Sequence, residues 1–194
     1  MKEIHQLRKH SWACLLSTLL IAGLTACDSG DEKNQATSSD SSSASTTKRT
    51  TQTGPAVGIL VDSPVSGISY AATSGKSGVT DEQGKFNFNH GDKIEFKLGN
   101  LTLGNIVGSQ IVTPIELAGD SPNKLQNLLV LLQSLDSDAN LSNGISISSE
   151  TAAAIKNSIN LDSDPAKFAE TAELKTIMAA SGITGEVRMP EEAR

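Results

Sequence analysis

Three oxygen-bearing side chains stand at alternating positions in one short segment: Asp136, Asp138 and Asn140. Carboxylate and amide oxygens are the ligands that Ca²⁺ prefers, and the ion takes about six to eight of them. The segment departs from the EF-hand pattern, because Leu141 replaces the glycine at the sixth position and Ile147 the glutamate at the twelfth. The spacing makes the three residues candidate calcium ligands, and a helix-terminating Asx loop is the alternative.

Two other segments resemble known functional motifs, one for phosphate binding and one for catalysis, but each lacks a residue that its motif requires. Gly75 and Lys76 suggest a phosphate-binding loop, but the glycine needed five positions before Gly75 is replaced by Tyr70. A Ser-His-Asp site would have to use His90, the only histidine after residue 26, and no G-x-S-x-G motif supplies its serine. We therefore interpret both segments as turns between strands and predict that the chain is not an enzyme.

The first 26 residues have the organisation of a secretory signal. A basic start precedes an apolar run from Trp12 to Leu24, which is too short for a membrane span and ends in small residues. The tetrad Leu-Thr-Ala-Cys ending at Cys27 resembles the lipobox of bacterial lipoproteins. This resemblance implies cleavage before Cys27 and lipidation of Cys27, and two or more acyl chains give stable anchoring. The alternative is an ordinary signal peptide with a chance cysteine.

Asp28 follows the predicted lipidated cysteine. It resembles the aspartate that, in enteric lipoproteins, signals retention in the inner membrane. Surface-exported lipoproteins can depart from this rule. The resemblance therefore predicts attachment to the bilayer of a bacterial cell envelope through Cys27. Inner membrane, outer membrane and cell surface all stay open.

Charge and cysteine content restrict what the mature chain can do. The signal holds three of the 16 Lys and Arg residues and one of the 22 Asp and Glu residues, so the remainder carries a net charge of −8. This acidity argues against nucleic acid as a partner. Cys14 lies in the signal and Cys27 would carry lipid, so the folded part has no cysteine for a disulfide. Its core must be stabilised by apolar burial.

Residues 27–54 are predicted to be a disordered tether. The segment is rich in serine and threonine and has no large apolar residue, so it cannot bury enough surface to offset the entropy of ordering. A flexible chain of this length would hold its ends roughly 25–30 Å apart.

Residues 55–115 have the pattern of short antiparallel strands. Apolar and polar residues alternate, and turn-forming segments such as Asp81–Gly84 and His90–Asp92 recur at nearly regular spacing. The alternation places these side chains on one buried face: Phe86, Phe88, Ile94, Phe96, Leu101 and Leu103. The pattern predicts a β-sandwich or barrel.

Residues 116–185 have helical periodicity, and residues 186–194 form a tail with little structural signal. Ser121 and Pro122 fit the start of a helix that continues through a leucine-rich stretch to Leu135. A second helix is predicted from Ser149 to Ile159, and a third begins after Asp164. The fold class is therefore α+β: an antiparallel β-sandwich followed by a helical segment of about three helices.

A longer stretch carries a second resemblance. The segment TDEQGKF, residues 80–86, resembles the Asp-initiated turn of transthyretin-like, carboxypeptidase-regulatory-like β-sandwiches. Together with GILVDSPVSGISY, VTPIEL and NLLVLLQSLDSDANLSNGISI, it is similar to a module of Gram-negative envelope lipoproteins, found in the N-terminal region of enteric mucin-degrading metalloproteases. The resemblance covers roughly residues 57–147. The HExxH zinc motif of those proteases is absent from this sequence.

The resemblance implies a non-catalytic binding, adhesion or scaffolding module with an unknown protein or glycan as ligand. One alternative is an accessory or immunity-type lipoprotein that binds a secreted partner protein. Another is a fragment of a larger polymer-degrading surface enzyme. No cofactor is expected beyond the calcium candidate.

Overall fold

The computed structural model describes residues 51–156 and 159–193, all of which belong to one compact unit, Lys48–Arg194. The predicted signal, Cys27, Asp28 and nearly all of the predicted tether lie outside the described residues. The predictions made for them therefore stay predictions.

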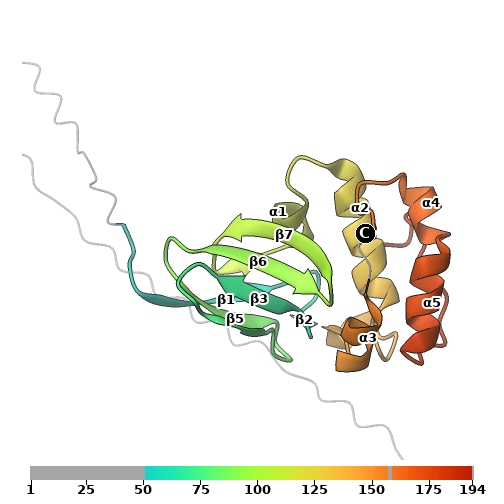
Figure 1. The fold of residues 1–194 in the computed structure, drawn as a ribbon, viewed down its shortest axis with the longest axis horizontal. Helices are drawn as coiled ribbons and strands as arrows, with labels where there is room; N and C mark the ends of the chain where they lie inside the picture. The colour runs from blue at the N-terminus through green and yellow to red at the C-terminus, as the bar shows by residue number, and fades with distance from the viewer. Residues whose placement is uncertain (1–50, 157–158, 194) are drawn as a thin grey trace, which may run out of the picture. The chain divides into compact units, whose positions relative to one another are not determined.

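The described residues form nine strands, and Figure 1 shows how the longer ones lie beside one another. The nine strands are β1 (Pro55–Leu60), β2 (Val65–Ser66), β3 (Ser69–Ala72), β4 (Ser77–Val79), β5 (Lys85–Asn89), β6 (Lys93–Leu98), β7 (Leu101–Val107), β8 (Ile111–Val112) and β9 (Ile145–Ser146). The hydrogen-bonded orders are β5-β1-β8, β4-β3-β6-β7 and β2-β9.

Four of the six strand pairs among the described residues are antiparallel, as predicted, and two short pairs are parallel. The chain returns after β7 to place β8 beside β1, with Leu60 opposite Val112. It returns again after the leucine-rich helix to place β9 beside β2, with Val65 opposite Ile145. Parallel pairs need a long connection between the strands, and periodicity within each strand does not reveal which distant strand will be its neighbour.

The helical part contains more and shorter helices than predicted. They are α1 (Pro114–Ala118), α2 (Pro122–Ser134), α3 (Ser149–Ala154), α4 (Pro165–Ala169) and α5 (Ala172–Ala180), with the 3₁₀ turn η1 (Leu141–Asn143) between α2 and β9. The α+β class is confirmed. No helix among the described residues is long and apolar enough to cross a membrane.

Local contacts explain where helices begin and end. Thr113 and Glu116 form a capping box that starts α1, a signal that the helical prediction overlooked. Ser121 caps α2 as predicted, since its side chain accepts a hydrogen bond from the Lys124 backbone N–H. α3 stops at Ala154 instead of Ile159. The carbonyl oxygen of Ile155 then accepts a hydrogen bond of 3.0 Å from Asn100 in the β6–β7 turn.

The predicted tail also packs against the helices. The backbone N–H of Arg188 donates to Ser134 Oγ at 2.8 Å, and Gln126 Nε2 donates to the Ala193 carbonyl oxygen at 2.8 Å. These two bonds join polar side chains to backbone groups, and neither kind of group produces the apolar periodicity from which helix contacts are predicted. The sequence pattern therefore did not reveal this contact.

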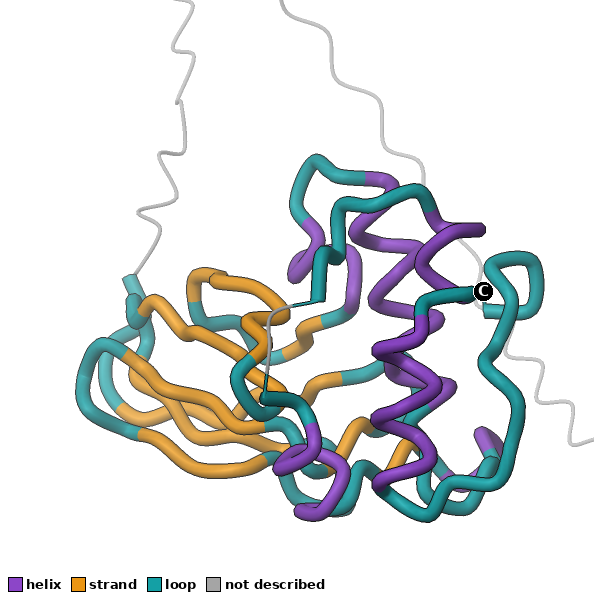
Figure 2. The backbone as a smooth tube through the Cα atoms, turned by 45° about the vertical axis from the view of Figure 1, so that its right-hand side comes forward, coloured by secondary structure: helices purple, strands orange, loops and turns teal. Residues whose placement is uncertain are grey.

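One apolar core joins the strands and the helices. Phe86 and Phe88 of β5 and Phe96 of β6 are fully buried, and the rings of Phe86 and Phe96 meet edge to face with centroids 5.0 Å apart. The same core continues into α2 through Leu128 and Leu131. Figure 2 shows the strands gathered on one side of the unit and most of the helices on the other. The predicted buried face is confirmed, while a closed sandwich remains a prediction.

Phe86→Ala is expected to cost about 3–5 kcal/mol of unfolding free energy, because it empties a fully enclosed site between Tyr70, Phe88 and Phe96. Urea unfolding of the purified chain measures this loss. Val107→Ala is the matched control, since Val107 is 65% exposed, and it should cost less than about 1 kcal/mol. Equal losses for the two variants would contradict the burial of Phe86.

Candidate functional site

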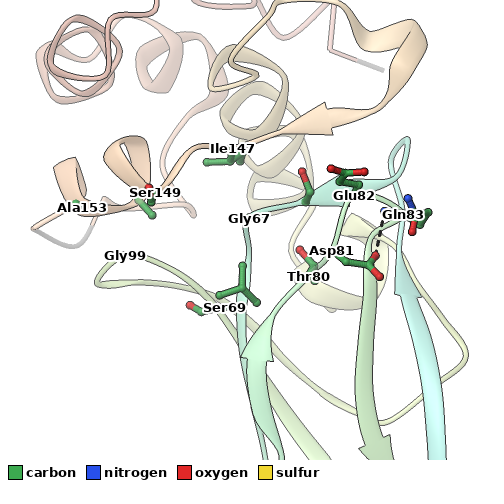
Figure 3. A pocket seen from close by; sticks show the side chains of 13 residues that line it. Gly67, Ser69, Thr80, Asp81, Glu82, Gln83, Gly99, Ile147, Ser149 and Ala153 are labelled. Carbon is green, nitrogen blue, oxygen red and sulfur yellow. Dashed lines mark hydrogen bonds between the residues drawn. The ribbon is translucent and has the colours of Figure 1, made fainter.

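A groove of about 770 Å³ opens where the ends of several strands meet α3 (Figure 3). Its lining combines small, hydroxyl-bearing and acidic or amide residues with two larger apolar ones, Val79 and Ile147: Ser66, Gly67, Ser69, Val79, Thr80, Asp81, Glu82, Gln83, Gly99, Ile147, Ser149, Ala152 and Ala153. Figure 3 shows Glu82 and Gln83 on one side, Ser149 and Ala153 on the other, and Ser69 between them. A concave surface at strand ends is a common place for ligands.

The β4–β5 turn forms one wall of the groove. The carboxylate of Asp81 accepts hydrogen bonds from the backbone N–H groups of Gln83 at 3.0 Å and Lys85 at 2.8 Å, which fixes an Asx turn. This turn leaves the side chains of Glu82 and Gln83 exposed. The wall therefore presents a carboxylate and an amide on a rigid backbone.

The segment from β9 to α3 forms the opposite wall, and two glycines allow its close approach. Gly67 has φ +86°, and a Cβ there would overlap the Ile147 carbonyl oxygen. Gly99 has φ +55°, and a Cβ there would overlap the Ala152 carbonyl oxygen. A side chain at either position would be strained and would push the segment from β9 to α3 away from the connection that carries the glycine.

Most hydroxyl groups along the groove already serve the fold. Thr80 Oγ1 accepts a hydrogen bond from the Ile68 backbone N–H at 3.0 Å, and Ser69 Oγ donates to the Lys97 carbonyl oxygen at 2.8 Å. The groove therefore offers a ligand the polar ends of Glu82 and Gln83 together with small apolar side chains such as Val79. It is suited to binding by shape and a few polar contacts.

The two segments rejected as catalytic in the sequence have structural roles here. Ser74, in the turn between β3 and β4, donates its backbone N–H and its hydroxyl to the carboxylate of Asp92, at 3.0 and 2.7 Å. His90 packs edge to face on Phe88 with ring centroids 5.8 Å apart.

Asp92 is a buried carboxylate that the sequence did not single out. It also accepts hydrogen bonds from the Thr73 hydroxyl at 3.0 Å and the Asn89 backbone N–H at 2.7 Å. The hydrogen bond from the Ser74 hydroxyl is the main cause that holds its pKa below the ordinary value of 3.8. Asp92 therefore connects the β3–β4 turn to the β5–β6 turn. Each of its carboxylate oxygens accepts two hydrogen bonds, so neither needs a ligand.

The candidate calcium ligands lie in the loop between α2 and β9, away from the groove lining. Asp136 is buried, and its Oδ1 accepts a hydrogen bond from the Ser146 backbone N–H at 2.9 Å. Burial is the main cause that raises the pKa of Asp136, and the negative charge of Asp138 raises it further. The structure therefore brings these two carboxyl groups together.

Asp138 and Asn140 also take part in an Asx loop. Asp138 accepts hydrogen bonds from the Asn143 side chain at 2.8 Å and the Asn140 backbone N–H at 2.9 Å, and the first of these is the main cause that lowers its pKa. Asn140 Oδ1 accepts from the hydroxyl of Ser142 at 2.6 Å and caps η1. The structure therefore gives Asn140 a capping role. In the part of the chain that the structure describes, no cluster holds three or more His, Cys, Asp or Glu side chains suited to a metal.

No protein family, no curated protein and no solved structure matched the chain. The resemblance to envelope lipoproteins and to carboxypeptidase-regulatory-like domains therefore stays a prediction.

Sequence reasoning did not find the groove. Its two walls are separated by more than 60 residues, and they meet because β9 pairs with β2. The one signal that pointed toward it was the Asp81–Gly84 turn, which was interpreted as a strand connection and as part of a family resemblance but not as the wall of a groove.

Gly67→Ala should destabilise the chain more than Gly75→Ala, although the two glycines have nearly the same positive φ, +86° and +87°. Around Gly75 a Cβ meets open space, so the cost is that of the backbone conformation alone, about 1–2 kcal/mol. At Gly67 the overlap with Ile147 should add at least about 1 kcal/mol. Urea unfolding of both variants measures the difference, and equal costs would mean that Gly67 and Ile147 are not in close contact.

Proposed function

We propose that this chain is a lipid-anchored protein of a bacterial cell envelope whose folded unit is a non-catalytic binding module. The groove beside α3 is its ligand site. The observation that carries the binding function is the construction of this groove: an Asx turn and two close glycine contacts hold two distant segments around about 770 Å³.

The order of the sequence supports the anchor. A signal-like segment ends at Cys27, and a serine- and threonine-rich stretch separates this cysteine from the first strand at Pro55. Such a stretch would let the folded unit stand away from the bilayer and reach a partner. The net charge of −8 after residue 26 favours a neutral or basic ligand over an anionic one.

The chemistry of the groove favours an extended segment of another protein as ligand. β4 is an edge strand of its sheet, all three of its residues are exposed, and Val79 is 61% exposed at the groove. An edge strand can pair with an extended peptide through its backbone. Small side chains on α3, such as Ala153, leave room for peptide side chains, and Glu82 can pair with a basic one.

Cys27→Ala is expected to release the protein from the membrane fraction, because the anchor proposed here depends on the lipids carried by that side chain. Fractionation of cells that express each form, with immunoblotting of the membrane and soluble fractions, measures the change. Ser29→Ala is a control that leaves the cysteine in place and should stay in the membrane fraction. Equal membrane retention of Cys27→Ala would refute the anchor.

Photo-crosslinking in cells tests the groove as a ligand site. Benzoylphenylalanine is placed at Gln83 or Ala153 in the groove, and at the exposed residues Gln110 and Ala179 as matched controls outside it. We expect discrete crosslinked protein bands from the two groove positions and none from the controls, since only the groove positions would face the ligand.

Two other outcomes have definite meanings. A polydisperse product that stains for carbohydrate would replace the protein ligand with a glycan. Identical crosslinking from groove and control positions would remove the groove as the binding site.

A further inference from the structure

One buried carboxylate oxygen accepts no hydrogen bond from any N–H or hydroxyl group of the described residues. Asp136 is 1% exposed, and this oxygen is its Oδ2. Its other oxygen is satisfied by the backbone N–H of Ser146. A buried polar atom without a partner costs about 1–3 kcal/mol, and more if it is charged, so such an atom calls for a physical explanation.

The surroundings of this oxygen are negatively charged. Burial is the main cause that raises the pKa of Asp136, and both the negative charge of Asp138 and a hydrogen bond shared between the two side chains raise it further. No Lys, Arg or His is among the groups that shift the pKa of either carboxyl group. Among the described residues, neither carboxylate takes part in an ion pair that would offset the repulsion.

We propose that Asp136 Oδ2 and the carboxylate of Asp138 bind a divalent cation, with Ca²⁺ as the ion. A carboxylate oxygen has two lone pairs, so each Asp138 oxygen can bind an ion while it accepts its one hydrogen bond. A Ca²⁺ ion bound here satisfies Asp136 Oδ2 and cancels the repulsion between the two groups. Water completes the coordination shell, as it does in many calcium sites.

The site has a structural purpose that does not depend on the groove. Asp136 directly follows the residue that caps α2, and its Oδ1 holds Ser146 of β9. The backbone N–H of Ser137 donates to the carbonyl oxygen of the same Ser146 at 2.9 Å. A bound cation would therefore stabilise the connection by which the chain leaves α2 and returns to the strands. With two carboxylates from the protein, the dissociation constant belongs in the range of about 10⁻⁴–10⁻³ M that is typical of extracellular calcium modules.

A shared proton would satisfy the same oxygen, and the experiment separates the two explanations. Thermal unfolding of the purified chain in a non-ionic detergent is followed in EDTA and in about 10 mM CaCl₂, with NaCl of equal ionic strength as the salt control. A bound ion at about 10 to 100 times its dissociation constant should raise Tm by about 3–10 °C. Isothermal titration with CaCl₂ should give one site.

The variants Asp136→Asn and Asp138→Asn should lose this calcium-dependent shift, while Asp120→Asn should keep it, because Asp120 is an exposed aspartate outside the loop. Asp138 is also exposed, so Asp138→Asn tests the site even where Asp136→Asn fails to fold. Absence of a calcium-dependent shift in the unaltered chain would overturn the proposal in favour of the shared proton. A shift of full size in both loop variants would overturn it too, because the ion would then bind elsewhere.

Discussion

The parallel pairing of β9 with β2 holds the two halves of the folded unit together. The backbone N–H of Ile145 donates to the Pro64 carbonyl oxygen at 2.9 Å, and that of Ile147 donates to the Ser66 carbonyl oxygen at 3.2 Å. These two bonds hold the segment that follows α2 against β2, so the chain returns there to the strands. Gly67 permits the close approach of Ile147 because it has no Cβ. Both the groove and the loop with the paired carboxylates follow from this return.

The same return gives the unit a single core. The β part has four large aromatic rings, and the helical part contributes leucines of α2 and Phe168 of α4 to one buried cluster. The described residues contain no cysteine, so burial of apolar side chains and backbone hydrogen bonding stabilise the unit. An apolar core shared between the two parts explains why they form one compact unit, although the sequence divides them by its periodicity.

The groove and the carboxylate loop lie on the same segment of chain but use different chemistry. Ile147 lines the groove, while the neighbouring Ser146 uses its backbone to hold Asp136. The binding function proposed above requires a rigid site, because a ligand would otherwise have to supply the free energy of ordering it. The Asx turn at Asp81 on one wall and the hydrogen bonds of the loop behind the other wall supply this rigidity.

The sequence alone determined the alternating strands within residues 55–115, the buried face and the principal helix. Phe86, Phe88 and Phe96 alternate with polar residues, and period-two alternation fixes which side chains are buried once one face of a sheet is covered. Ser121 followed by Pro122 marks the start of α2, since capping depends on neighbouring residues only. These features are local, so a local pattern is enough to predict them.

Only the tertiary structure decided how the distant parts meet. It paired Ile145 with Val65, ended α3 where the β6–β7 turn takes the carbonyl of Ile155, and left one oxygen of Asp136 without an N–H or hydroxyl donor among the described residues. The alternating Asp136 and Asp138 were visible in the sequence, but their burial, their proximity and the capping role of Asn140 were not. These properties depend on contacts between residues far apart in the chain, which neither composition nor periodicity encodes.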